Sequence, residues 1–270
     1  MSALIDTAIR DLVVRGRINA TSVLVGGPAM QRSEAVLLRL LNSAAPRVAI
    51  GLHVALTAPL LPLSKGFVPT RDKAFLPLAE TMRHALMRRY DPRALRMEIM
   101  RQMQAFFDLF GRAPDFVDGH HHVQLLPQVS EAVLDVVKES APGAWLRQCG
   151  RAVPLAARFS DRKALLLDAL SVRFRRRAYA CGLRTNPAFA GTYDFKPDTD
   201  YPAVFRRFLE RLPDGGLVMC HPGFVDLDLQ RLDRLTALRE REHAFFAGDA
   251  FSALLQHHGV ALARPNGRVI

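Results

Sequence analysis

Apolar residues recur along this chain with two alternating patterns. Apolar positions three and four residues apart predict helices, which we expect at 3–15, 30–41, 78–89, 92–110, 128–139, 161–180, 201–212, 229–246 and 249–258. Short apolar runs between glycines, prolines or polar residues predict strands, which we expect at 20–25, 48–56, 144–147, 189–192, 216–220 and 260–263, and in the run that leads into Gly119. Residues 57–77 carry four prolines and should form a long loop that contributes to substrate choice.

Strands that alternate with helices predict a parallel sheet covered by helices. About seven strands suit a barrel better than a small open sheet. We therefore expect an α/β fold, an irregular TIM-like (β/α) barrel. Because no linker-like segment divides the chain, residues 1–270 should form a single domain.

The composition is that of a folded protein, with 49% hydrophobic and 23% charged residues. Asp6, Arg10 and Asp11 interrupt the segment in which a signal peptide would need an apolar core. The longest apolar stretch, 48–63, is broken and too short to span a bilayer. We therefore expect no stable membrane insertion. Three cysteines without CxxC spacing predict reduced thiols, so we expect a cytoplasmic protein.

A net charge of +11 raises the question of an anionic partner. The densest basic patch is Arg173, Arg175, Arg176 and Arg177, near the end of a predicted helix. A solvated helix end explains such a patch, because the helix dipole favours cations there. An acidic glycan or a lipid headgroup is the alternative. Because no nucleic-acid motif accompanies the patch, we expect no nucleic-acid partner.

The segment VDGHHHVQLLP, residues 117–127, places an aspartate and three histidines directly after an apolar run. Neutral imidazole is the commonest metal ligand among side chains. On an extended backbone Asp118, His120 and His122 would share one face, and His121 would lie on the other. A hydrogen-bonded structural cluster is the alternative interpretation.

Two further apolar runs end near a histidine. They are GLHVALT, residues 51–57, with His53, and VMCHPGFVD, residues 218–226, with His221. A lone histidine in such a run is more often a satisfied core residue. However, chemistry gathers at the carboxyl ends of parallel strands, so three such segments in one chain predict a shared pocket.

These three segments, together with LFGRAPDF before the histidine cluster, resemble the YdjC-like carbohydrate deacetylases. That family includes enzymes of chitooligosaccharide breakdown and of hopanoid biosynthesis. The resemblance implies a (β/α) barrel with a divalent metal ion, magnesium or zinc, held by one aspartate and two histidines. By position, it implies that His53 and His120 are metal ligands and that His122 is a neighbouring or alternative ligand. Asp118 would not bind the metal ion itself but would orient one of the residues that do.

The implied reaction is hydrolysis of an N-acetyl group from an amino sugar or glycan. The metal would lower the pKa of water, and His221 would act as the general acid that protonates the leaving amine. Asp226 would orient His221, and Arg147 would contact acetyl or sugar oxygens. Gln124 stands where the family often has another histidine. We keep a homodimer as the assembly to test.

One departure from the family pattern bears on activity. Family members begin with a strand that ends in a motif such as ADDFG, and here that motif would precede Met1. Asp6 and Asp11 fall in the first predicted helix and do not replace it. We therefore expect the first barrel strand and an acidic ligand to be missing, either because Met1 is internal to a longer protein or because the protein is catalytically impaired. The chain as given should bind zinc or magnesium weakly and show little activity, which calorimetric titration would check.

Three other functions are compatible with these residues. A different metal hydrolase, such as a phosphoesterase, would suit the basic charge. A glycan-binding relative without turnover would suit the missing aspartates. A cysteine hydrolase using Cys220 and His221 is disfavoured, because adjacent residues on a strand point to opposite faces.

Overall fold

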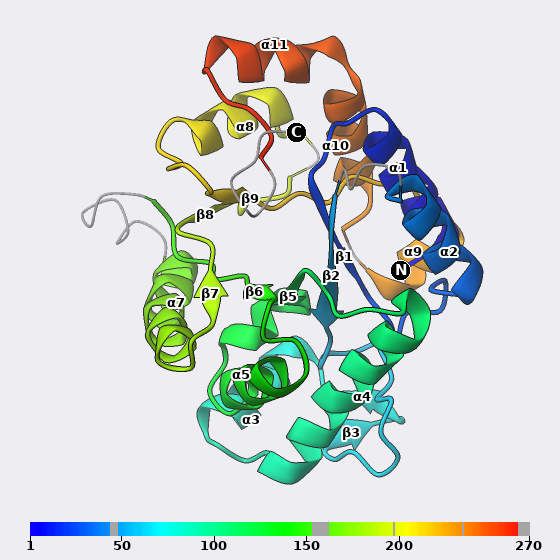
Figure 1. Cartoon of the computed structure of the whole chain (residues 1–270), viewed down its shortest axis with the longest axis vertical. Coiled ribbons are helices and arrows are strands. Elements are labelled where there is room, and N and C mark those ends of the chain that lie inside the picture. The colour runs from blue at the N-terminus through cyan, green and yellow to red at the C-terminus, as the bar shows by residue number, and fades with distance from the viewer. Residues whose placement is uncertain (44–47, 153–161, 197, 234, 264–270) are drawn as a thin grey trace.

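The structure is a computed structural model that describes residues 1–43, 48–152, 162–196, 198–233 and 235–263. Helices lie around the outside and short strands lie toward the middle (Figure 1). The helices are α1 (Ala3–Val14), α2 (Arg32–Leu41), α3 (Leu78–Leu86), α4 (Pro92–Phe110), α5 (Val129–Ser140), α7 (Arg162–Ala180), α8 (Tyr201–Leu209), α9 (Leu227–Leu232), α10 (Ala237–Ala247) and α11 (Asp249–His257). No helix in these ranges is both long enough and apolar enough to cross a membrane.

The central sheet is parallel and has the order β1-β2-β5-β6-β7. Its strands are β1 (Ala20–Val23), β2 (Ala49–Val54), β5 (Phe116–Gly119), β6 (Trp145–Leu146) and β7 (Arg184–Thr185). A separate parallel pair is formed by β8 (Phe189–Ala190) and β9 (Leu217–Val218). The expected α/β class with a mostly parallel sheet is confirmed. Within the described residues, however, the strands do not close into a barrel.

Local signals define α4, a helix that packs against β2 and α5. The side chain of Asp91 caps the first turn by accepting hydrogen bonds from the N–H groups of Arg93 and Ala94, and Pro92 occupies the first helical position. Gly111 ends the helix with a φ of 66°, a conformation that glycine adopts without steric cost.

Two buried polar side chains on α4 fasten the loop that follows β2. The carboxylate of Glu98 accepts hydrogen bonds from the backbone N–H groups of Leu63 and Ser64. Gln102 accepts from the N–H of Ala55 and donates to its carbonyl oxygen. Since these partners satisfy the buried polar groups, the start of the loop is held against the helix rather than left free.

The structure corrects several predicted elements. The loop 57–77 contains a two-stranded antiparallel ribbon, β3 (Thr70–Arg71) and β4 (Ala74–Phe75), and β7 was not predicted. The predicted helix 229–246 is two helices, α9 and α10, and the predicted strand 260–263 is not a strand. The predicted start of the arginine-rich helix at Asp161 lies outside the described residues. The missed strands are two residues long, so a few residues carry their signal, and the break between α9 and α10 interrupts an otherwise continuous helical pattern.

Gly51 on β2 makes room for an aromatic pair inside the sheet. The rings of Phe116 and Trp145 stack with centroids 4.5 Å apart, and a Cβ atom at position 51 would lie 2.5 Å from the Phe116 ring. The Gly51→Ala variant must shift this ring, so we expect a loss of about 1–3 kcal/mol in the free energy of unfolding. Urea titration measures it. Gly143→Ala is the matched control, because no atom lies within 4 Å of its added Cβ. Equal stability of the two variants would contradict the expectation.

Candidate functional site

A cavity of about 1510 Å³ is lined by residues of β1, β2, β5 and β9 and of the segments beside them. Its polar lining includes imidazoles from three separate segments: His53 on β2, His120 after β5 and His221 after β9. The structure therefore brings together the three histidine segments that the sequence predicted to share a pocket.

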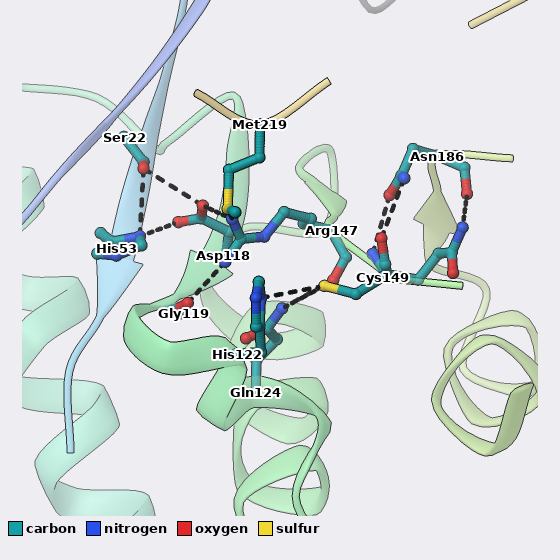
Figure 2. Close-up of polar contacts among 11 residues, drawn as sticks. Ser22, His53, Asp118, Gly119, His122, Gln124, Arg147, Cys149, Asn186 and Met219 are labelled. Atoms are coloured by element: carbon teal, nitrogen blue, oxygen red, sulfur yellow. Dashed lines mark hydrogen bonds and ion pairs between the residues drawn. The ribbon is translucent and has the colours of Figure 1, made fainter. Parts of the chain in front are cut away.

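His53 is oriented by hydrogen-bonding partners on neighbouring strands. In the parallel pairing of β2 with β5, His53 lies opposite Asp118, and its Nδ1 atom is 2.6 Å from Asp118 Oδ1. Ser22 on β1 brings its Oγ atom within 3.2 Å of the same Nδ1 and donates to Asp118 Oδ2 at 3.3 Å (Figure 2). Because Nδ1 is engaged, Nε2 is the ring nitrogen of His53 that remains for a ligand.

Asp118 also belongs to a buried ion pair. Its Oδ2 atom lies 3.2 Å from Arg147 Nη1, and both residues are only 4% exposed. Burial opposes ionisation of Asp118, but the positive charge of Arg147 and the contact with His53 outweigh it and lower the pKa of Asp118 to about 2. The carboxylate is therefore charged at neutral pH. Arg147 Nη2 donates to the Gly119 carbonyl oxygen, so the guanidinium is held by the protein (Figure 2).

The histidine cluster does not continue the strand. β5 ends at Gly119, and His120–Leu125 forms a 3₁₀ helix, η1, in which His121 and His122 have φ angles of 52° and 59°. Left-handed backbone at two consecutive non-glycine residues is uncommon and is found at functional sites. The expected alternation of side chains is therefore wrong, because it assumed an extended backbone.

The turn sends the three imidazoles in different directions. The His120 ring faces His53, with ring centroids 5.6 Å apart. His121 lies against His120, and its Nδ1 is 2.9 Å from Thr57 Oγ1. His122 Nδ1 instead lies 3.3 Å from the buried thiol of Cys149 (Figure 2). The geometry thus pairs His53 with His120 and places the His122 Nδ1 away from them.

Gln124 lies behind the site. It is fully buried, and its Nε2 atom donates to the Arg147 carbonyl oxygen at 3.0 Å. Its Oε1 atom is buried and has no hydrogen-bond partner among the described residues. Gln124 therefore ties η1 to the segment that carries Arg147, and it does not line the cavity.

His221 extends into the cavity from the segment that follows β9. Its ring packs edge-on against Phe195, with centroids 5.7 Å apart, and its buried Nδ1 has no hydrogen-bond partner in the described part of the chain. Burial, aided by the positive charge of Arg239, lowers the pKa of His221 to about 3. The structure therefore holds this imidazole neutral at physiological pH.

Asp226 is not placed beside His221. Its side chain caps α9 by accepting from the Leu229 N–H at 2.7 Å, and it also accepts from the Leu4 N–H. It has no hydrogen bond to His221 within the described ranges and does not line the cavity. The predicted orienting role of Asp226 therefore has no support in the geometry.

Sequence reasoning missed several residues of the site: Ser22, Thr57, Asp233, Arg239 and Glu242. Ser22 and Thr57 gave no usable signal, because isolated hydroxyl residues are common at strand ends. Arg239 and Glu242 lie in the segment LREREHAF, in which charged residues look like an ordinary exposed helix face. Their burial, at 4% and 0% exposed, distinguishes them only in the folded protein.

Two imidazoles in this cavity suit a divalent metal ion. Burial lowers the pKa of His120 to about 2, so its ring is neutral, which is the form that binds metal. No hydrogen bond to the His120 ring forms among the described residues, so its nitrogens are available. The same residues contain no ready-made group of three or more ligands. The fit therefore rests on His53 and His120, with the remaining positions left for water, substrate or other groups.

Comparison with known proteins identifies relatives over most of the chain. The profile of the family described as YdjC-like protein matches residues 1–257. Chitooligosaccharide deacetylase from Citrobacter koseri is 29% identical over 226 residues, which cover 78% of this chain and 73% of the relative. The protein of the same name from Escherichia fergusonii is 27% identical, and the match covers 83% and 79%.

A solved structure shares the fold. It is from Enterococcus faecalis V583 and is described as a proposed cellobiose-phosphate cleavage protein. The TM-score is 0.72 at 19% identity, over 98% of this chain and 93% of the other. At that identity the likeness establishes the architecture, and the site must be argued from its own residues.

Proposed function

The chain belongs to the YdjC-like protein family, and from this premise we propose that it is a carbohydrate N-deacetylase. The substrate would be an acetylated amino sugar or glycan, and the reaction would be hydrolysis of its acetamide bond. The observation that carries the proposal is the convergence of His53, His120 and His221 in one cavity. Relatives named chitooligosaccharide deacetylase support the same class of reaction.

We further propose that His53 and His120 hold a divalent metal ion. When bound, the metal would polarise the acetamide carbonyl and lower the pKa of water. Asp118 keeps His53 in one tautomer and one orientation through the 2.6 Å contact to Nδ1. The positive charge of Arg147 keeps Asp118 ionised, and the Ser22 hydroxyl lies within hydrogen-bonding distance of both His53 and Asp118. These residues prepare the site by fixing a ligand before any substrate arrives.

His221 is the group we propose for proton transfer to the leaving amine. An amine leaves as a neutral molecule only if its nitrogen is protonated as the bond breaks. Because His221 is neutral in the structure, it would first accept the proton that the attacking water loses and then deliver that proton to the leaving nitrogen. Its partly apolar surroundings, including the Phe195 ring, would keep bulk water from competing for that proton.

Release of acetate from short chitooligosaccharides tests the proposal. The protein is stripped of metal, reloaded with zinc or magnesium and assayed beside a panel of sugar phosphates. We expect acetate release that is slow in the chain as given but depends on metal, and His221→Ala should lower it by about 10²–10⁴-fold, the usual contribution of a general acid. Phosphate release instead of acetate release would overturn the reaction class. Saturable glycan binding without turnover would indicate that the protein binds glycans rather than hydrolysing them.

A further inference from the structure

The backbone N–H and the backbone carbonyl of His221 are both hydrogen-bonded by side chains of one helix. Glu242 on α10 accepts a hydrogen bond from the His221 backbone N–H at 2.5 Å. Arg239, also on α10, directs its Nη1 atom to the His221 carbonyl oxygen at 3.4 Å. Residues three apart on a helix lie on the same face, so the two side chains can reach the two peptide groups on either side of the His221 Cα atom. We call Arg239 and Glu242 the α10 clamp.

Both side chains of the α10 clamp are buried and hydrogen-bonded. Burial raises the pKa of Glu242, while hydrogen bonds from Tyr193 Oη, at 2.7 Å, and from the His221 N–H favour its ionised form. Arg239 Nη2 pairs with Asp233 at 2.6 Å, and its Nε donates to the Leu235 carbonyl oxygen. Because buried polar groups without partners are costly, this arrangement specifies one position for the backbone of His221.

The ring of His221 lacks comparable support. Its Nδ1 atom has no hydrogen-bond partner within the described residues, and the predicted partner Asp226 caps α9 instead. Among the described residues, the ring makes one aromatic contact, edge-on with Phe195. The position of the imidazole is therefore set through its backbone. The short strand β9 ends at Val218, so the sheet does not hold residue 221 directly.

We propose that Glu242, with Arg239, is a positioning residue that sets the His221 imidazole for proton transfer to the leaving amine. The proposal rests on the proposed function, and it adds a determinant of catalysis that does not itself contact substrate. Glu242 does not line the cavity, and its two carboxylate oxygens are already engaged, one by Tyr193 and the other by His221. It is therefore poorly suited to act as a metal ligand or as a base on substrate. Arg239 does line the cavity, so Glu242 is the cleaner residue to test.

The test compares two substrates that differ in their need for a general acid. An acetamido sugar requires protonation of its leaving amine, whereas 4-nitrophenyl acetate releases a stable phenolate and does not. For Glu242→Gln we expect kcat on the acetamido sugar to fall about 30-fold or more, with KM and the ester rate changed less than about 3-fold. The glutamine side chain would retain the size of the original. Its NH₂ group, however, would face either the Tyr193 hydroxyl or the His221 N–H, and both of these are donors. Equal losses on both substrates would overturn the proposal.

Tyr193→Phe is the matched control. It removes a hydrogen bond to the same buried carboxylate and leaves the contact with His221 intact. We expect lower stability and an unchanged ratio of acetamide to ester turnover. If Tyr193→Phe changes that ratio as much as Glu242→Gln does, the effect is general loosening and the proposal fails.

Coupling between the two residues gives a second, independent readout. If Glu242 acts through His221, Glu242→Gln should cost less than about 2-fold on the acetamido sugar in a His221→Ala background, because effects through one group are not additive. If the turnover loss of the double variant equals the product of the two single-variant losses, the proposal is contradicted. NMR of the histidine rings keeps the inference testable without activity. The His221 signals should shift in Glu242→Gln and stay in place in Tyr193→Phe, whereas an inactive wild-type protein would count against the proposed function alone.

Discussion

Replacing His120 with alanine is expected to abolish metal-dependent acetate release. The ring lies opposite His53, is held neutral by burial, and forms no hydrogen bond among the described residues that would give it a structural task. Loss of one of two converging imidazoles should lower zinc affinity by more than about 100-fold, since even groups that only support a metal ligand contribute 10–100-fold. Calorimetric titration with zinc measures the affinity, and acetate release measures turnover.

His257→Ala is the matched control for His120→Ala. His257 is an exposed histidine at the end of α11 and is absent from the lining of the cavity. It should leave zinc affinity and turnover within about 2-fold of the wild-type values. Unchanged turnover in His120→Ala would remove this residue from the site and, with it, the assignment of a metal to the pair.

Replacing Arg147 with alanine is expected to have the largest effect on stability. The variant leaves the Asp118 carboxylate buried at 4% exposure without its cationic partner, and it removes a hydrogen bond to the Gly119 carbonyl oxygen. Breaking a buried ion pair in this way costs about 3–5 kcal/mol, because the remaining charge is uncompensated. Urea unfolding, followed by circular dichroism, measures the change.

Two controls separate the lost charge pair from lost packing. Arg96→Ala removes an arginine from an exposed ion pair with Glu139 and should cost about 1 kcal/mol or less. Adding Asp118→Asn to Arg147→Ala removes the stranded charge, so the double variant should recover part of the lost stability. A double variant less stable than Arg147→Ala would show that the carboxylate contributes through other contacts.

Element types could be predicted from the sequence where the signals are local. The bounds of α4 follow from the cap at Asp91, the proline after it and the stop at Gly111, which all act within one turn of the helix ends. The histidine segments could likewise be placed at strand ends, because each follows an apolar run. Short elements such as β7 carry only two residues, and no periodic pattern can form over that length.

The candidate site shows the same division. The residue types suited to metal binding and proton transfer are visible in the sequence, including His53, His120 and His221. The partner of His221 is not, because Asp226 is nearest in sequence while Glu242, twenty-one residues away, makes the contact. The direction of His122 was also mispredicted, since it depends on a left-handed turn rather than on strand alternation.

The sequence by itself determined the α/β class, most of the helices and the segments that carry the chemistry, because hydrophobic periodicity and helix caps are encoded within a few neighbouring residues. The tertiary structure decided which of those segments meet. His53 contacts Asp118 across 65 residues because β2 and β5 pair in one register, and a shift of one residue would turn the side chains to opposite faces. That register depends on packing of the whole sheet, so it cannot be predicted from any local pattern in the sequence.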